Sequence, residues 1–208
     1  MRRALMVFSV TVLTVLAAGP ASAADPDDPP PAEPVPIELV TVNGSGCKPG
    51  TAHVTMGPDN KSFEISYDNY IAQAGGESLP TDFRKNCQVN LRIDAPPDYS
   101  YVITDVTHLG YASLAEGATG QVRNNYYFQG MSQGTWVTHT YTGPRDDDWQ
   151  ATDTNVWVPA ACGEYRNLNI NTEVRVRRGA DKSALSFMTI ATTGGGVRTK
   201  VGLAWRRC

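Results

Sequence analysis

The sequence lacks the apolar pattern of a helix: no window of 11 or more residues repeats apolar side chains at the 3.6-residue spacing. It also lacks internal repeats of 20 to 50 residues, which argues against a propeller or a solenoid. Its three histidines form no H-x-H or H-E-x-x-H pair, and its four cysteines form no C-x-x-C pair, so a zinc site is disfavoured. No nucleic-acid recognition motif is present, so nucleic acid is not an expected partner.

What the sequence does contain is alternation of apolar and polar residues, the period of a half-buried strand. It is clearest at 87–93 and 168–176, and at 52–56 and 63–67, which the turn at 57–60 joins into a hairpin. Further strands are expected at 37–42, 100–107, 119–128, 135–141, 155–158, 184–191 and 197–206. About ten strands without crossover helices predict an all-β fold, an antiparallel two-sheet β-sandwich, with a closed β-barrel as the alternative.

The N-terminus has the features of a secretory signal peptide. Arg2 and Arg3 precede an apolar run from Ala4 to Ala18, and Ala21-Ser22-Ala23 is a cleavage-type site of small residues. A membrane anchor is the competing interpretation, but the run is short for a bilayer span. We therefore predict a signal peptide at 1–24 and a secreted, extracellular mature chain without a membrane span.

The mature chain is expected to begin with a spacer. Residues 25–36 read DPDDPPPAEPVP, which has too few apolar groups for a core and favours extended polyproline conformation. A single disulfide-stapled domain is then expected at 37–208, a length that suits one hydrophobic core.

An exported chain with an even number of cysteines is expected to form disulfides, and the four here are Cys47, Cys87, Cys162 and Cys208. Three pairings are possible. We favour Cys47–Cys87 with Cys162–Cys208, because each bond then ties one half of the domain to itself. A chain that ends on cysteine would fray without its bond, so that pair is expected to be structural.

The segment Gly130-Met131-Ser132-Gln133-Gly134 fits the G-x-S-x-G signature of serine hydrolases, whose serine lies between a strand and a helix. Residues 135–139 alternate and are rich in β-forming residues, so a second strand is expected after the motif. We interpret 130–134 as a hairpin loop whose glycines supply positive φ angles. His139 without an oriented acid is weak evidence for a nucleophile at Ser132.

The densest group of carboxylates is Asp146, Asp147, Asp148 and Asp153, and Ca²⁺ prefers oxygen ligands of this kind. Their spacing does not match an EF-hand loop. We interpret the run as a solvated turn after Gly143-Pro144, with Ca²⁺ binding as the alternative; no other cofactor is expected.

A glycosidase would need two carboxyls about 5–10 Å apart. The acids that lie in or beside predicted strands are Asp105, Glu164 and Glu173. The sequence does not bring any two of them together, so we interpret them as sheet carboxylates and keep an extracellular hydrolase as an alternative.

Aromatic residues gather in the middle of the chain. Five of them, Tyr126, Tyr127, Trp136, Tyr141 and Trp149, are candidates for a sugar-binding platform, because exposed rings stack on pyranose faces while amides such as Asn124, Asn125 and Gln129 bond hydroxyls. The same residues are ordinary in sandwich cores. Tyr126 and Tyr127 point to opposite faces of a strand, so at least one side must be buried.

Charge is unevenly distributed along the chain: residues 37–165 carry 7 Lys/Arg and 15 Asp/Glu, and residues 166–208 carry 9 and 2. The C-terminal cations are candidates for a basic patch that attracts an anionic envelope polymer. They are Arg175, Arg177, Arg178, Lys182, Arg198, Lys200, Arg206 and Arg207. The alternative is that they pair with acidic neighbours within the molecule.

Several blocks resemble the secreted proteins grouped as domain of unknown function 4360, found in bacteria and fungi. They are RKNCQVNLRI at 84–93, GYASLAEGATG at 110–120, YYFQG at 126–130, DDDWQ at 146–150, CGEYRNLNINTEVRV at 162–176 and LAWRRC at 203–208. The resemblance implies a small exported protein with two cysteine pairs. It carries no catalytic or binding residue over to this chain.

Together these features predict a secreted, non-catalytic binding protein whose partner is a polysaccharide or another component of the cell envelope. Two alternatives stay open: an extracellular hydrolase that uses strand carboxylates, and a structural or antagonistic surface protein. A cleft with two converging acids would favour the hydrolase, and exposed rings would favour the binding protein.

Overall fold

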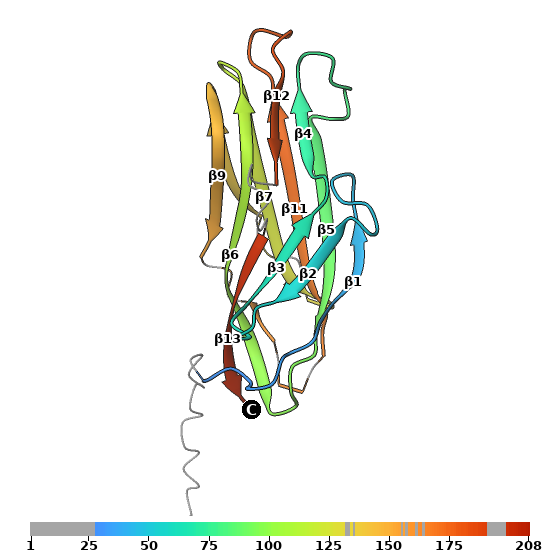
Figure 1. The fold of residues 1–208 in the computed structure, drawn as a ribbon, viewed down its shortest axis with the longest axis vertical. Coiled ribbons are helices and arrows are strands. Elements are labelled where there is room, and N and C mark those ends of the chain that lie inside the picture. Colours follow the sequence, from blue (N-terminus) through green and yellow to red (C-terminus); the bar gives the residue numbers. More distant parts are fainter. Residues whose placement is uncertain are drawn as a thin grey trace, which may run out of the picture.

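The structure is a computed structural model that describes residues 28–131, 134, 136–154, 156, 158–160, 162–163, 165–190 and 199–208. Over these ranges the chain forms strands and contains no helix that could cross a membrane (Figure 1). The strands are β1 (Ile37–Asn43), β2 (Ala52–Met56), β3 (Ser62–Tyr67), β4 (Ile71–Ala74), β5 (Arg84–Ile93), β6 (Tyr99–Leu114), β7 (Thr119–Phe128), β8 (Val137–Thr142), β9 (Arg145–Asp153), β10 (Val158–Pro159), β11 (Leu168–Arg177), β12 (Ser186–Thr189) and β13 (Thr199–Arg207).

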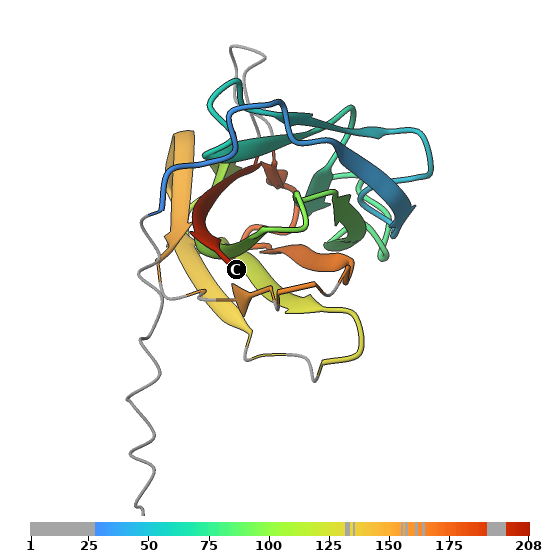
Figure 2. The same cartoon turned by 90° about the horizontal axis from the view of Figure 1, so that it is seen from below.

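The strands form two antiparallel sheets. The five-stranded sheet has the order β1-β5-β11-β7-β8, and the eight-stranded sheet follows β2-β3-β13-β6-β12-β4 with β9 and β10 paired to β6. Viewed from below, β7 and β11 (yellow and orange) lie on the opposite side of the molecule from β2 and β3 (teal) (Figure 2). Neither sheet closes on itself, so the predicted two-sheet β-sandwich is confirmed and the strands do not form the alternative, a closed barrel.

The core lies between the two sheets and follows from the alternation in the sequence. On β5, Val89 and Leu91 are fully buried, and on β11 so are Ile170 and Val174; Phe63 of the eight-stranded sheet belongs to the same buried cluster. Each fully buried aliphatic side chain contributes roughly 1.5–3 kcal/mol. Because the inward positions are apolar and the outward ones polar, a register slip of one residue would expose this whole set.

Two disulfides close the domain, Cys47–Cys87 with a Cα–Cα distance of 5.3 Å and Cys162–Cys208 with 5.9 Å. This is the pairing that the sequence favoured. The bonds close loops with sequence separations of 40 and 46 residues, and each contributes about 4 kcal/mol in the chain-entropy treatment.

The run Asp146-Asp147-Asp148 lies in strand β9, so its interpretation as a solvated turn is wrong. β9 pairs with β6, and from Trp149 onward it alternates between buried and more exposed side chains, with Ala151 also buried. The three aspartates are exposed at this end of the strand. Consecutive acids hid the alternation in the sequence, although charged side chains are common on strands that protect a sheet from pairing with other chains.

The segment 28–36, expected to belong to a spacer, lies against the domain. The Asn60 side chain donates to the carbonyl oxygens of Pro31 at 2.9 Å and Glu33 at 2.8 Å, and it accepts from the Val35 N–H at 3.0 Å. Asn60 has φ 55°, a left-handed conformation that asparagine tolerates better than most residues. One buried side chain therefore fixes this proline-rich segment.

Candidate functional site

The outward side of four strands of the five-stranded sheet, β5, β11, β7 and β8, is polar, and we call it the sheet face. It consists of the side chains that alternate with the core residues of four neighbouring strands. They are Arg84, Asn86, Gln88, Asn90 and Arg92 of β5; Asn169, Asn171, Glu173, Arg175 and Arg177 of β11; Thr119, Gln121, Arg123, Asn125 and Tyr127 of β7; and Thr138, Thr140 and Thr142 of β8. None is aliphatic, so every position offers a hydrogen-bonding group.

One half of the sheet face is a network of amides, which we call the amide cluster. Asn167 Nδ2 donates to Asn90 Oδ1 at 2.7 Å, and Asn90 Nδ2 donates to Asn169 Oδ1 at 3.0 Å. Gln88 Nε2 donates to Tyr127 OH at 3.3 Å. These bonds hold the amide planes and the phenol in fixed orientations, which lowers the entropy cost of binding a polar ligand.

The other half is built around Glu173, and we call it the arginine cage. Arg84, Arg123 and Arg175 all contact the Glu173 carboxylate, which is only 3% exposed although it lies on the outward side. Burial opposes ionisation of Glu173, but hydrogen bonds from Arg175 and Arg84 outweigh it, so the pKa of this carboxyl lies below its usual value. The carboxylate is therefore ionised at neutral pH and serves as an anchor for three guanidinium groups.

Trp136 extends the sheet face beyond the strands. It is 37% exposed, and the guanidinium carbon of Arg123 lies 5.1 Å from the centre of its ring. The preceding loop is tied to β7 because Asn125 Nδ2 donates to the Gly134 carbonyl oxygen. The ring thus stands beside the arginine cage.

The G-x-S-x-G motif is followed by strand β8, as predicted, rather than by the helix of a nucleophile elbow. β7 and β8 pair antiparallel up to Asn124 and Val137. Ser132 itself lies outside the described residues.

The structure separates the five aromatic candidates. Tyr127 and Trp136 lie on the sheet face, whereas Tyr126 and Trp149 are buried, 8% and 2% exposed. Tyr141 packs against Trp149 with ring centres 5.5 Å apart, and its hydroxyl donates to the Gln150 carbonyl oxygen at 2.8 Å.

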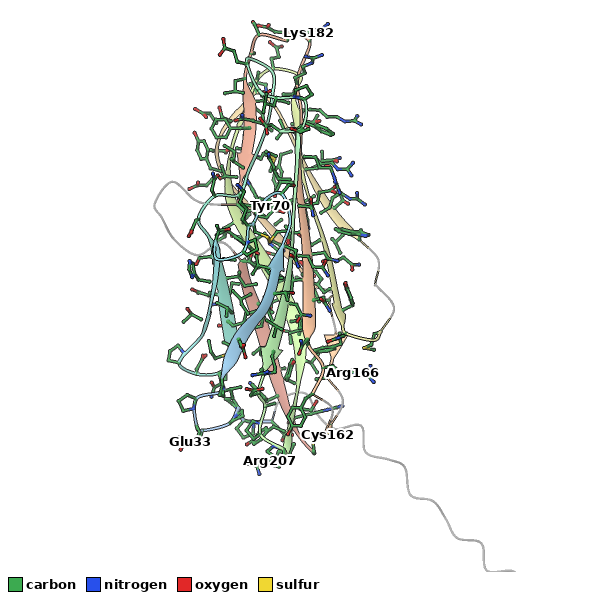
Figure 3. All side chains as sticks on the ribbon, turned by 90° about the vertical axis from the view of Figure 1, so that its right-hand side faces the viewer. Glu33, Tyr70, Cys162, Arg166, Lys182 and Arg207 are labelled. Atoms are coloured by element: carbon green, nitrogen blue, oxygen red, sulfur yellow. A yellow bond between two sulfur atoms is a disulfide. The ribbon has the colours of Figure 1, made fainter. Side chains whose placement is uncertain are left out.

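The C-terminal cations do not form a single patch. Lys182 and Arg207 lie at opposite ends of the molecule (Figure 3), and Arg198 is outside the described residues. Arg206 donates to the Ala160 carbonyl oxygen at 3.3 Å. The remaining members are Arg175 in the cage, Arg177 on the sheet face, Arg178 after β11, and Lys200 on β13.

Sequence reasoning missed Arg84 and Arg123, which come from the acidic part of the chain. They meet Arg175 only because β5 and β7 flank β11 with Arg84 opposite Arg175 and Arg123 opposite Glu173. Identifying Arg84 and Arg123 as site residues therefore required the order and register of these strands, which the sequence alone did not supply.

A second polar group lies inside the sandwich, around Asp153, and we call it the Asp153 cluster. Asp153 accepts hydrogen bonds from Tyr126 OH at 2.6 Å, Asn124 Nδ2 at 3.0 Å and His139 Nε2 at 2.5 Å. Because the Tyr126 hydroxyl donates to Asp153, it must accept from His108 Nε2, which lies 2.9 Å away. His139 therefore has an oriented acid, which the sequence did not reveal.

The Asp153 cluster borders a pocket of about 440 Å³, which Tyr126, Val137, Thr152, Asp153 and Val156 help to line. Burial and the Asp153 carboxylate raise the pKa of Tyr126 well above its usual value. The donors around Asp153 occupy most of its lone pairs, and its side chain is 1% exposed. The cluster thus serves chiefly to satisfy a buried carboxylate between the sheets.

The predicted carboxylates do not converge. Over the described ranges, no three His, Cys, Asp or Glu side chains are grouped as a metal site, and Asp153 is buried away from the exposed Asp146 to Asp148. Asp105 and Glu173, suggested for hydrolysis, lie in different sheets, and Glu164 is outside the described residues. The lowered pKa of Glu173 is also opposite to that of a general acid.

Two solved structures show a weak similarity to this chain. One is TmCBM61 in complex with beta-1,4-galactotriose, with a TM-score of 0.33, 12% identity, and coverage of 82% of this chain and 91% of that chain. The other is the enzymatically active domain of bacteriophage CBA120 tailspike protein 4, with a TM-score of 0.26, 14% identity, and coverage of 81% and 19%. At TM-scores below 0.5, neither structure informs the function of this chain.

An "Uncharacterized secreted protein" of Arthroderma benhamiae is 32% identical over 195 residues, which is 91% of this chain and 76% of that protein. Two disulfides are consistent with an extracellular location as well. Residues 33–208 match the family described as Domain of unknown function (DUF4360). The chain therefore belongs to the DUF4360 family.

Proposed function

We propose that this protein is a secreted glycan-binding protein that holds a polysaccharide on the sheet face. The observation that carries the proposal is the sheet face itself: four adjacent strands present amides, hydroxyls and guanidinium groups at every outward position, with the rings of Tyr127 and Trp136 among them. Sugars need this combination, because their hydroxyls pair with planar polar groups while their C–H faces pack against aromatic rings.

The amide cluster supports the proposal because its groups are already oriented by one another. Amides can donate and accept at once, so each can bind a sugar hydroxyl in either sense. Two amide oxygens on the sheet face, those of Asn125 and Asn171, are buried and accept no hydrogen bond from any described residue. Such acceptors are normally satisfied by water or by a ligand.

The shape of the site favours a polymer over a small molecule. Outward residues follow one another at about 6.6 Å along each strand, and neighbouring strands are about 4.8 Å apart, so equivalent groups recur over an extended area. An extended face of this kind contacts one side of several linked sugars. A monosaccharide would bury only a fraction of it.

The proposal is tested by screening the purified mature chain against a glycan array and then measuring affinities for the best ligand by calorimetry. Tyr127→Ala and Trp136→Ala are expected to weaken binding at least about fivefold each, since an aromatic contact contributes on the order of 1 kcal/mol beyond the area it buries.

The matched control is Tyr111→Ala on the eight-stranded sheet, where the Tyr111 hydroxyl donates to Asp146 at 2.6 Å. This variant is expected to bind like the wild type. Equal losses in all three variants, or no binding to any glycan on the array, would overturn the proposal. Melting temperatures of the variants verify that each is folded.

A further inference from the structure

We infer that the polysaccharide is acidic and that the arginine cage binds its anionic groups. This inference rests on the glycan-binding function proposed above and adds a chemical class to it. It concerns the half of the sheet face around Glu173, where three guanidinium groups from three different strands meet.

The arginine cage contains more hydrogen-bond donors than Glu173 can accept from. Each guanidinium has five N–H donors, so three have about fifteen, whereas one ionised carboxylate offers about four acceptor sites. Glu173 therefore uses a minority of the donors that surround it. The excess faces solvent, where it can bind a further anion.

The arginine cage carries an excess of positive charge. Three arginines around one glutamate leave the cage with two positive charges that no side chain of the cage cancels. Arg177, two residues beyond Arg175 on the same side of β11, is also exposed. Arg92 differs, because Glu38 at 2.6 Å and Asp94 at 3.1 Å neutralise it.

The arginine side chains of the cage are accessible from solvent. The side chains of Arg84, Arg123 and Arg175 are 45%, 30% and 37% exposed, while that of Glu173 is 4% exposed. Glu173 thus lies beneath the guanidinium groups and holds them, and a ligand approaching from outside meets arginine first. Guanidinium forks match the geometry of carboxylates and of sulfate or phosphate esters, and their bonds to anions are the stronger, charge-assisted kind.

The position of the cage suits a sugar polymer that spans both halves of the sheet face. Glu173 and Asn169 lie on the same strand four residues apart, which corresponds to about 13 Å. One linked sugar can therefore present its anionic group to the cage while another contacts the amide cluster.

A structural role for the ion group does not explain its composition. One arginine in bidentate contact is enough to neutralise a single carboxylate. The two additional arginines therefore place positive charges close to one another, which is unfavourable. A cage that binds an external anion relieves this repulsion. The inference therefore predicts ligand binding that is sensitive to the charge of the polymer.

The test compares two pairs of polymers on the wild-type protein: polygalacturonate with its methyl ester, and dextran sulfate with dextran. In each pair the sugar chain is the same and the anionic group is masked or absent. We expect at least about tenfold tighter binding of an acidic polymer, because charge-assisted bonds contribute about 1.5–3 kcal/mol each and 1.4 kcal/mol is a factor of ten. The preference should decline as NaCl is raised.

Two variants locate the effect. Arg84→Gln and Arg175→Gln each leave Glu173 with two arginines, and each is expected to weaken binding of the acidic polymer about tenfold and binding of the matched neutral polymer much less. Arg145→Gln is the matched control, because Arg145 contacts Asp147 on β9 of the eight-stranded sheet, outside the sheet face, and its side chain is 28% exposed, close to the 30% of Arg123. It should retain wild-type affinity.

Each outcome has one meaning. Preference for polygalacturonate alone identifies a carboxylate as the group that the cage binds, and preference for dextran sulfate alone identifies a sulfate ester. Preference for both shows that the cage recognises negative charge in general. All three results support the inference. Binding of neutral glycans with no preference for an acidic polymer overturns the inference and leaves the proposed function standing, as does an equal loss in Arg145→Gln. Absence of binding to any polymer overturns both.

Discussion

Acidification is expected to destabilise this protein through one buried histidine, His108. Its ring is fully buried, with Nδ1 3.0 Å from Thr199 Oγ1 and Nε2 2.9 Å from Tyr126 OH. Burial lowers the pKa of His108 to about 4; nearby Asp153 acts against this change and His139 adds to it. In the unfolded chain the same imidazole titrates near pH 6.5.

The direction of the effect follows from where the protons bind. Between about pH 6.5 and about pH 4, the unfolded chain carries a proton on His108 and the folded protein does not, so falling pH favours unfolding. The contribution of neutral His108 to the free energy of unfolding is therefore fully present above about pH 6.5 and decreases as the pH falls toward about 4. A difference of about 2.5 pKa units corresponds to roughly 3 kcal/mol, a large share of a net stability of about 5–15 kcal/mol.

The assay is urea unfolding at a series of pH values, followed by the fluorescence of the buried Trp149 and Trp205. His108→Gln serves as the comparison, because glutamine can hydrogen-bond but does not titrate. Between pH 7 and about 4.5, the wild type should lose roughly 2–3 kcal/mol more than the variant, since the carboxylates titrate equally in both. Parallel pH profiles would refute the reasoning, because they would mean that the folded protein protonates His108 as easily as the unfolded chain does.

Three further changes test the fold. Asn60→Ala should lower the free energy of unfolding by about 3 kcal/mol and increase proteolysis within 28–36, because it removes three hydrogen bonds to that segment. An unchanged melting temperature and an unchanged rate of cleavage would contradict this. Replacing Cys162 and Cys208 together with serine should lower the free energy of unfolding by about 4 kcal/mol, measured in urea, and a loss below about 1 kcal/mol would show that the bond does little. Gly110→Ala should lower the melting temperature by many degrees, since its Cβ would lie 1.9 Å from the Thr189 carbonyl oxygen; a fully stable variant would mean that β6 and β12 are farther apart.

Much of the fold was predictable because it depends on local periodicity. The alternation at 87–93 and 168–176 predicted β5 and β11 and their buried faces, and the hairpin at 52–67 became β2 and β3. The strands that were missed had weaker local signals. β4 spans only four residues, and in β9 the first residue, Arg145, is followed by three acids, a run that resembles a turn.

The candidate site was predictable only in part, because it depends on which strands become neighbours. Arg84, Arg123 and Arg175 are far apart in the sequence, and only the order β5-β11-β7 with its register brings them to Glu173. The acid that orients His139 was hidden for the same reason, since Asp153 comes from the opposite sheet. Tyr127 and Trp136 were identified from the sequence, but their separation from Tyr126 and Trp149 required the burial pattern.

Binding of polysaccharide on the sheet face is tested most directly by NMR, with an oligogalacturonate titrated into the ¹⁵N-labelled protein. The account predicts that the largest shifts occur at the Trp136 indole N–H, at the side-chain amides of Asn90 and Asn169, and at the guanidinium N–H groups of Arg84 and Arg175. Shifts confined to the pocket beside Asp153 or to the outward side of the eight-stranded sheet would contradict it.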